Sequence, residues 1–100
     1  MNQHFDRENA SRIDRIAHYE EIMDRILRII KAEGITPGVY ERVLPDLKEL
    51  EDYYTSPEWK EDYAADEVGL LPAGLKRGVL SQDGIDGLLE RFRDLKTRPS

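Results

Sequence analysis

Two aspartates, a tyrosine and the only tryptophan of the chain recur at helical spacing, as Trp59, Asp62, Tyr63 and Asp66. At about 100° per residue these side chains share one face of a helix, with Glu58 beside Asp62. A ring as large as that of Trp59 is expected to be buried. This face is therefore predicted to turn inward or toward a groove, where its carboxylates need cationic partners.

Two cations, Lys76 and Arg77, follow after a predicted turn at Leu71-Pro72. The favoured interpretation is a structural clamp, in which these cations neutralise Asp62 and Asp66 and fix the turn over the tryptophan. An alternative is an acidic pocket that binds a ligand's cation, a partner's Arg or Lys, or a divalent metal. The metal is disfavoured because no shaped loop of oxygen ligands is evident. Catalysis by the two carboxylates is the least favoured alternative.

Other chemistry finds little support in the residue types present. The chain has no cysteine, which excludes disulfides and thiol chemistry. His18 and Glu21 have the spacing of half a di-iron motif, but the second half is missing. Tyr53 and Tyr54 could serve as an acid or as hydrogen-bond donors, but an aromatic pair at a helix end is expected to pack. We expect no catalytic residue, cofactor or metal, and no enzymatic activity.

Capping residues and apolar periodicity predict four helices and no strand. The first begins near Asn9 or Ser11 and ends at Glu33, before Gly34. The other predicted elements are Pro37 to Tyr54 with a kink at Pro45, Pro57 to Gly69, a brief turn over Ala73 to Arg77, and a last helix capped by Ser81. Residues 1–10 are expected to be a flexible N-terminus, and residues 11–97 a single helical domain.

The apolar positions of the first helix cover more than half of its circumference, which is wider than one-sided burial needs. This helix is expected to contact two neighbours, or one neighbour and a second copy of itself in a homodimer. The last helix has a narrower stripe at Ile85, Leu88, Leu89, Phe92 and Leu95. Gly84 and Gly87 within it suggest that another backbone approaches closely.

The charge of the chain restricts its partners. A net charge of -6 disfavours binding to nucleic acid, which requires a basic face. No apolar run approaches the ~20 residues that span a bilayer, and the first residues do not resemble a signal peptide. A cytoplasmic protein that contacts no membrane is expected.

Residues 53–83, which we call the motif segment, contain three ordered runs: Tyr53-Tyr54-x-Ser56-x-Glu58-Trp59-x-x-Asp62-Tyr63, Asp66-Glu67-x-Gly69-x-Leu71-Pro72, and Leu75-Lys76-Arg77-Gly78-Val79-Leu80-Ser81-x-Asp83. On this motif the chain resembles a bacterial family of small helical proteins known as domain of unknown function 4298. The resemblance implies an all-helical fold and supplies no activity.

These observations predict an all-α fold, in which a long antiparallel helix pair is closed by the short Trp-bearing helix and the C-terminal helix. The expected function is a non-catalytic binding or scaffold module that acts through protein–protein contacts. One alternative is an acidic mimic that occupies a basic, nucleic-acid-binding protein surface. Another is a small accessory enzyme that uses Asp62, Asp66 and Tyr63. The candidate binding or clamp surface comprises Tyr54, Glu58, Trp59, Asp62, Tyr63, Asp66, Lys76 and Arg77.

Overall fold

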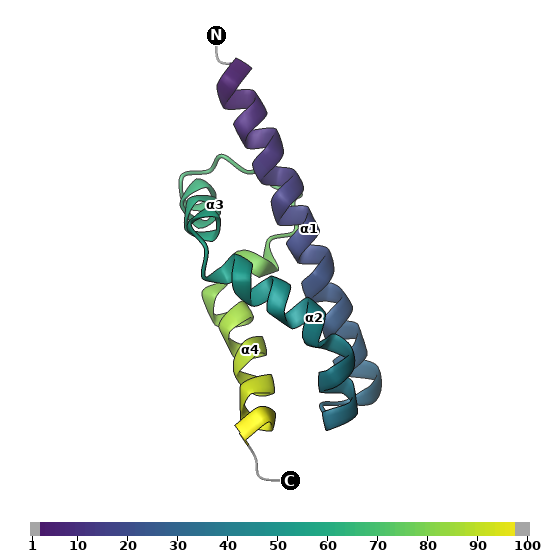
Figure 1. Cartoon of the computed structure of the whole chain (residues 1–100). Coiled ribbons are helices and arrows are strands. Elements are labelled where there is room, and N and C mark those ends of the chain that lie inside the picture. Colours follow the sequence, from purple (N-terminus) through teal and green to yellow (C-terminus); the bar gives the residue numbers. More distant parts are fainter. Residues whose placement is uncertain (1–2, 98–100) are drawn as a thin grey trace.

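The computed structural model describes the backbone of residues 3–97 and the side chains of Arg7 and residues 9–93 (Figure 1). Within that range the chain is helical and contains no strand, which confirms the all-α prediction. The elements are α1 (Gln3–Glu33), α2 (Pro37–Tyr54), α3 (Pro57–Glu67), the 3₁₀ turn η1 (Gly78–Leu80) and α4 (Gln82–Thr97).

The hairpin between α1 and α2 follows the predicted capping chemistry. Gly34 ends α1 with a φ of 79°, a left-handed conformation that glycine adopts without strain, and its N–H donates to the Ile30 carbonyl at 2.8 Å. Thr36 then caps α2, because its hydroxyl accepts a hydrogen bond from the Val39 N–H at 3.1 Å. Pro37 occupies the first turn, where a missing N–H costs no helical hydrogen bond.

The predicted start of the first helix was wrong, because α1 begins at Gln3 rather than near Asn9 or Ser11. Asn9 lies inside the helix, and its side-chain amide donates to the Leu70 carbonyl at 3.1 Å. This side chain therefore attaches the early part of α1 to the connection after α3 instead of capping a helix.

The helix α2 continues through Pro45 as one element, as the unbroken apolar phase predicted. Five of its side chains are buried, at the helical spacing of one face: Val39, Val43, Leu47, Leu50 and Tyr53.

The wide apolar face of α1 is covered within the chain by two neighbours, α2 and η1. Ile16, Ile22 and Ile26 are buried there, whereas Leu27 lies at the margin with 38% of its surface exposed. The molecule is elongated, at 58 × 23 × 20 Å, and the N-terminal end of α1 extends beyond α2 (Figure 1).

The last helix packs on α2 and η1 through the predicted stripe, with Ile85, Leu88, Leu89 and Phe92 buried. The side chain of Leu95 lies outside the described residues. Ser81 accepts a hydrogen bond from the Gly84 N–H at 3.1 Å, which confirms the predicted cap. The helical turn predicted over Ala73 to Arg77 was misplaced, since the one-turn helix is η1.

The two glycines of α4 differ in their surroundings. A Cβ on Gly84 would lie 3.3 Å from the Ser81 hydroxyl and 3.6 Å from the Gly78 carbonyl oxygen, so the tightest approach is by the helix's own cap and the η1 backbone lies at ordinary contact distance. A Cβ on Gly87 would meet nothing within 4 Å, so the close approach predicted for it was wrong.

Candidate functional site

Asp62 is fully buried, with 0% of its surface exposed, and its carboxylate is saturated by side chains from two other helices. Arg15 of α1 donates two hydrogen bonds to it, from Nε to Oδ2 at 2.9 Å and from Nη2 to Oδ1 at 2.5 Å. The Tyr53 hydroxyl of α2 donates to Oδ2 at 2.6 Å. The Arg12 Nε lies 3.5 Å from Oδ1. This carboxylate therefore joins α1, α2 and α3.

The predicted clamp was right for Asp66 and wrong for Asp62. The Arg77 guanidinium pairs with Asp66, and its Nη2 also donates to the Pro72 carbonyl at 2.6 Å. Lys76 pairs instead with Asp24 of α1, at 2.8 Å. Asp62 has its cations in α1, where Arg15 supplies a guanidinium group from 47 positions earlier in the chain and Arg12 lies close by.

Trp59 is 8% exposed and packs in an aromatic row, so the predicted inward turn is confirmed for Trp59 and Asp62 but not for Tyr63, which is 36% exposed on the same helix face. Its ring lies edge-on to that of Tyr54, with centroids 5.0 Å apart, and stacked with that of Tyr63, with centroids 5.2 Å apart. The indole N–H donates to the Val79 carbonyl at 3.0 Å. Trp59 therefore attaches α3 to η1.

Glu20 of α1 is a buried carboxylate that sequence reasoning missed. It is 7% exposed, and its Oε1 accepts a hydrogen bond from the Val79 N–H at 2.8 Å. Both backbone groups of Val79 are thus bonded to side chains, one from α1 and one from α3. The available signal was that Glu20 follows Ile16 by one helical turn and so lies on the apolar face.

Replacing Glu20 by alanine is expected to lower the free energy of unfolding by about 1–3 kcal/mol, because the buried Val79 N–H would lose its acceptor. Chemical denaturation followed by circular dichroism measures this loss. The matched control is Glu21→Ala, at an adjacent exposed position, where a change within about 0.5 kcal/mol is expected. Equal effects of the two substitutions would contradict the assigned role of Glu20.

The Tyr53 ring stacks on that of Tyr19, with centroids 4.0 Å apart and planes parallel. Burial is the main cause that raises the pKa of the Tyr53 phenol, and the hydrogen bond to Asp62 raises it further. Because the folded-state pKa exceeds the unfolded one, Tyr53 contributes its full stability below the unfolded pKa of about 10. That contribution is lost as pH rises above this value.

The expected result is a free energy of unfolding that falls above about pH 10, with Tyr53 ionising when the protein unfolds. Alkaline titration of tyrosinate absorbance alongside circular dichroism measures both events. In Tyr53→Phe the alkaline loss should be smaller. If Tyr53 in the folded protein titrated with the ordinary tyrosine pKa of about 10, the assignment would be refuted.

The predicted surface residues do not form one continuous site. Asp62 and Trp59 lie in the core, Asp66 and Arg77 form a half-buried pair, and Lys76 lies against α1. Among the remaining members, Glu58 and Tyr63 are exposed and Tyr54 is half-buried. Within the described residues, no group of three His, Cys, Asp or Glu side chains could hold a metal ion. None of the helices in that range is long and apolar enough to span a bilayer.

The motif segment thus forms the contacts that join α1, α3 and η1. The family model described as domain of unknown function (DUF4298) matches residues 16–98. The chain belongs to the DUF4298 family. This match confirms the resemblance and covers most of the first helix as well. No curated protein and no solved structure matches the chain. In this DUF4298 protein, Arg12 and Arg15 lie just before the matched region, although they pair with Asp62 inside it.

Proposed function

We propose that this DUF4298 protein is a small non-catalytic helical scaffold that binds another protein. The observation that supports this most directly is the burial of Asp62, which is bonded to Arg15 and Tyr53. A general acid or base must lie within hydrogen-bond distance of its substrate. Asp62 has no exposed surface, and Tyr63 faces solvent at 36% exposure, so the two do not share an open pocket. The motif's acids are better suited to maintaining a rigid fold.

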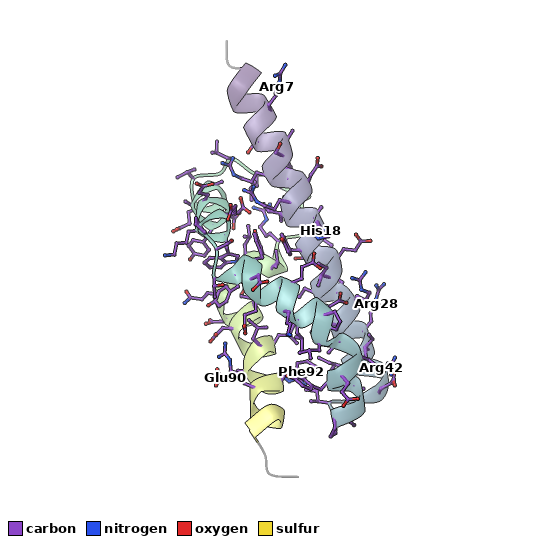
Figure 2. The ribbon with its side chains drawn as sticks, viewed as in Figure 1. Arg7, His18, Arg28, Arg42, Glu90 and Phe92 are labelled. Atoms are coloured by element: carbon purple, nitrogen blue, oxygen red, sulfur yellow. The ribbon has the colours of Figure 1, made fainter. Side chains whose placement is uncertain are left out.

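The proposed docking surface is a groove between α2 and α4, with a volume of about 700 Å³. Figure 2 shows Phe92 in the space between these two helices. Apolar side chains form most of the lining, and charged ones complete it: Tyr40, Leu44, Leu47, Leu89 and Phe92, with Lys48, Glu51 and Arg93. Tyr40 and Leu44 are half-buried and therefore offer apolar surface to a partner.

The occupant that this groove fits is an amphipathic helix of another protein. The α2 part of the lining extends from Tyr40 to Glu51, which corresponds to about 16 Å, or three turns of a bound helix. The charged residues of the lining are Lys48, Glu51 and Arg93, and Arg93 is already paired with Glu51 at 3.7 Å and with Glu90 at 3.8 Å. The positive charge of Lys48 therefore favours a partner helix with an acidic flank. Most of the wide face of α1 packs on α2 and η1 within the chain, so we place the contact in the groove and not between two copies.

Site-specific photo-crosslinking in the source cells tests this proposal. Benzoylphenylalanine at position 40 replaces an aromatic side chain of the groove, and the same residue at position 63 replaces an exposed aromatic side chain of α3. The expected result is a discrete adduct through position 40, with the crosslinked partner peptide forming an amphipathic helix. The substitution Lys48→Glu should reduce this adduct by weakening the attraction to the acidic flank.

An adduct formed only through position 63 would contradict the groove and support the acidic mimic, because α3 exposes Glu61 and Glu67 along with Tyr63. An adduct at position 40 that Lys48→Glu leaves unchanged would reject the acidic-flanked helix as the partner. The absence of any adduct at both positions would contradict the scaffold proposal itself.

A further inference from the structure

A second concave surface, separate from the groove, lies where the connection before η1 meets α1. Its volume is about 330 Å³, and it is lined by Asp24, Leu27, Arg28, Lys31 and Lys76. The first four residues lie one or two turns apart along a single stripe of α1. Figure 2 shows Arg28 on the edge of the molecule that α1 forms, opposite the edge that α4 forms.

The neighbouring residues of the motif segment hold Lys76 in position at this surface. On one side, the Arg77 guanidinium is bonded to Asp66 and to the Pro72 and Leu75 carbonyls. Farther on, Val79 is fixed through both of its backbone groups. Lys76 itself remains largely exposed, with 73% of its side-chain surface accessible. Its ammonium group is thus presented to ligands from a rigid backbone.

The surface has an excess of positive charge in an acidic protein. Three cations line it against one carboxylate, Asp24, which is already paired with Lys76 at 2.8 Å. Within the described part of the chain, Arg28 and Lys31 form no hydrogen bond or ion pair. The pKa of Lys76 is raised mainly by its hydrogen bond to Asp24, while Arg28 acts in the opposite direction. Arg28 is therefore within electrostatic range of Lys76.

We propose that this pocket binds the oxyanion group, phosphate or carboxylate, of a small organic molecule. The planar guanidinium of Arg28 can donate two parallel hydrogen bonds to such a group, and the ammonium groups of Lys31 and Lys76 add charge-assisted bonds. Leu27, which is 38% exposed, provides an apolar wall for the organic part of the ligand.

The size and charge of the pocket favour a small anion over a nucleic acid. A polynucleotide requires an extended basic face along which it can release counterions. This chain has a net charge of -6, and the cationic lining is confined to one pocket of about 330 Å³. That volume is at the lower end of ordinary small-molecule sites.

Titration of the ¹⁵N-labelled protein with phenyl phosphate and, separately, with benzoate tests the proposal, at constant ionic strength maintained with sodium chloride. The expected result is a set of saturable amide shifts centred on Leu27, Arg28, Lys31 and Lys76. Saturation by phenyl phosphate alone assigns a phosphate ester, saturation by benzoate alone assigns a carboxylate, and saturation by both assigns their shared oxyanion chemistry.

The substitution Arg28→Gln is expected to weaken binding at least about tenfold, because the paired charge-assisted hydrogen bonds of the guanidinium are lost. Because Arg28 is exposed and unbonded within the described chain, this variant should fold normally, as its circular dichroism melting curve would show. The matched control Lys60→Gln removes an exposed cation of α3 and should leave the affinity unchanged. Unsaturable shifts with both probes, or equal affinities of Arg28→Gln and the unaltered protein, would overturn the proposal.

Discussion

Replacing Asp62 by asparagine is expected to lower the free energy of unfolding by about 3 kcal/mol. Removing one partner of a buried ion pair typically costs about 3–5 kcal/mol, because the other charge is left uncompensated. The lower end of this energy range applies because the Arg15 side chain is 28% exposed, so water can solvate part of the guanidinium that has lost its partner. Urea denaturation followed by circular dichroism at low ionic strength measures the loss.

The matched control for this prediction is Glu61→Gln, which removes a carboxylate from the adjacent, exposed position of α3. A change within about 0.5 kcal/mol is expected there. An Asp62→Asn protein more stable than the unaltered one would contradict the structural role. It would indicate that the carboxylate is retained at a cost to stability, as functional groups often are.

Replacing Trp59 by alanine is expected to lower the free energy of unfolding by about 3–5 kcal/mol, the usual cost of removing a large buried aromatic side chain. Two effects combine in this variant. The ring row with Tyr54 and Tyr63 loses its central member, and the Val79 carbonyl loses its donor. Guanidinium denaturation measured by far-ultraviolet circular dichroism gives the total loss of free energy of unfolding.

The variant Trp59→Phe separates these two effects, because it keeps an aromatic ring and removes the indole N–H. We expect a loss of about 1–3 kcal/mol, the cost of an unsatisfied buried carbonyl together with imperfect filling of the space. If alanine and phenylalanine variants were both within about 0.5 kcal/mol of the unaltered protein, α3 would not be attached through this side chain.

Local signals made most of the helical architecture predictable. The sequence Gly34-Ile35-Thr36-Pro37 combines a helix stop, a cap and a first-turn proline, so the hairpin between α1 and α2 was predicted correctly. The cap of α4 at Ser81 was predicted by the same reasoning. Such features depend on residues within one or two turns of each other, and local physical chemistry determines them.

The partners of buried polar groups were less predictable, because they depend on which helices lie side by side. Proximity in sequence suggested Lys76 and Arg77 for Asp62, whereas Arg15 supplies the charge from α1. A clue was present, since Arg12 and Arg15 each precede an inward-facing residue of α1 by one turn, Ile16 and Tyr19. Cations at the margin of an apolar face indicate a nearby acid but do not identify it.

The groove and the cationic pocket were not predicted, because each is formed by surfaces of separate elements. Nothing in the sequence distinguishes Leu27, Arg28 and Lys31 from the other positions of the first helix. Their grouping with Lys76 depends on the path of the connection before η1, for which the sequence indicates a turn but no direction.

The bonds from Glu20 to Val79 and from Asn9 to Leu70 join residues 59 and 61 positions apart. For a small helical protein these are long loops to close, and the hairpin of α1 and α2 can form before them from nearby residues. During synthesis from the N-terminus, α1 leaves the ribosome well before Val79 has been added to the chain. Glu20 therefore lacks its Val79 donor until that residue has left the ribosome, and we expect η1 to dock late, onto a helix pair that is already formed.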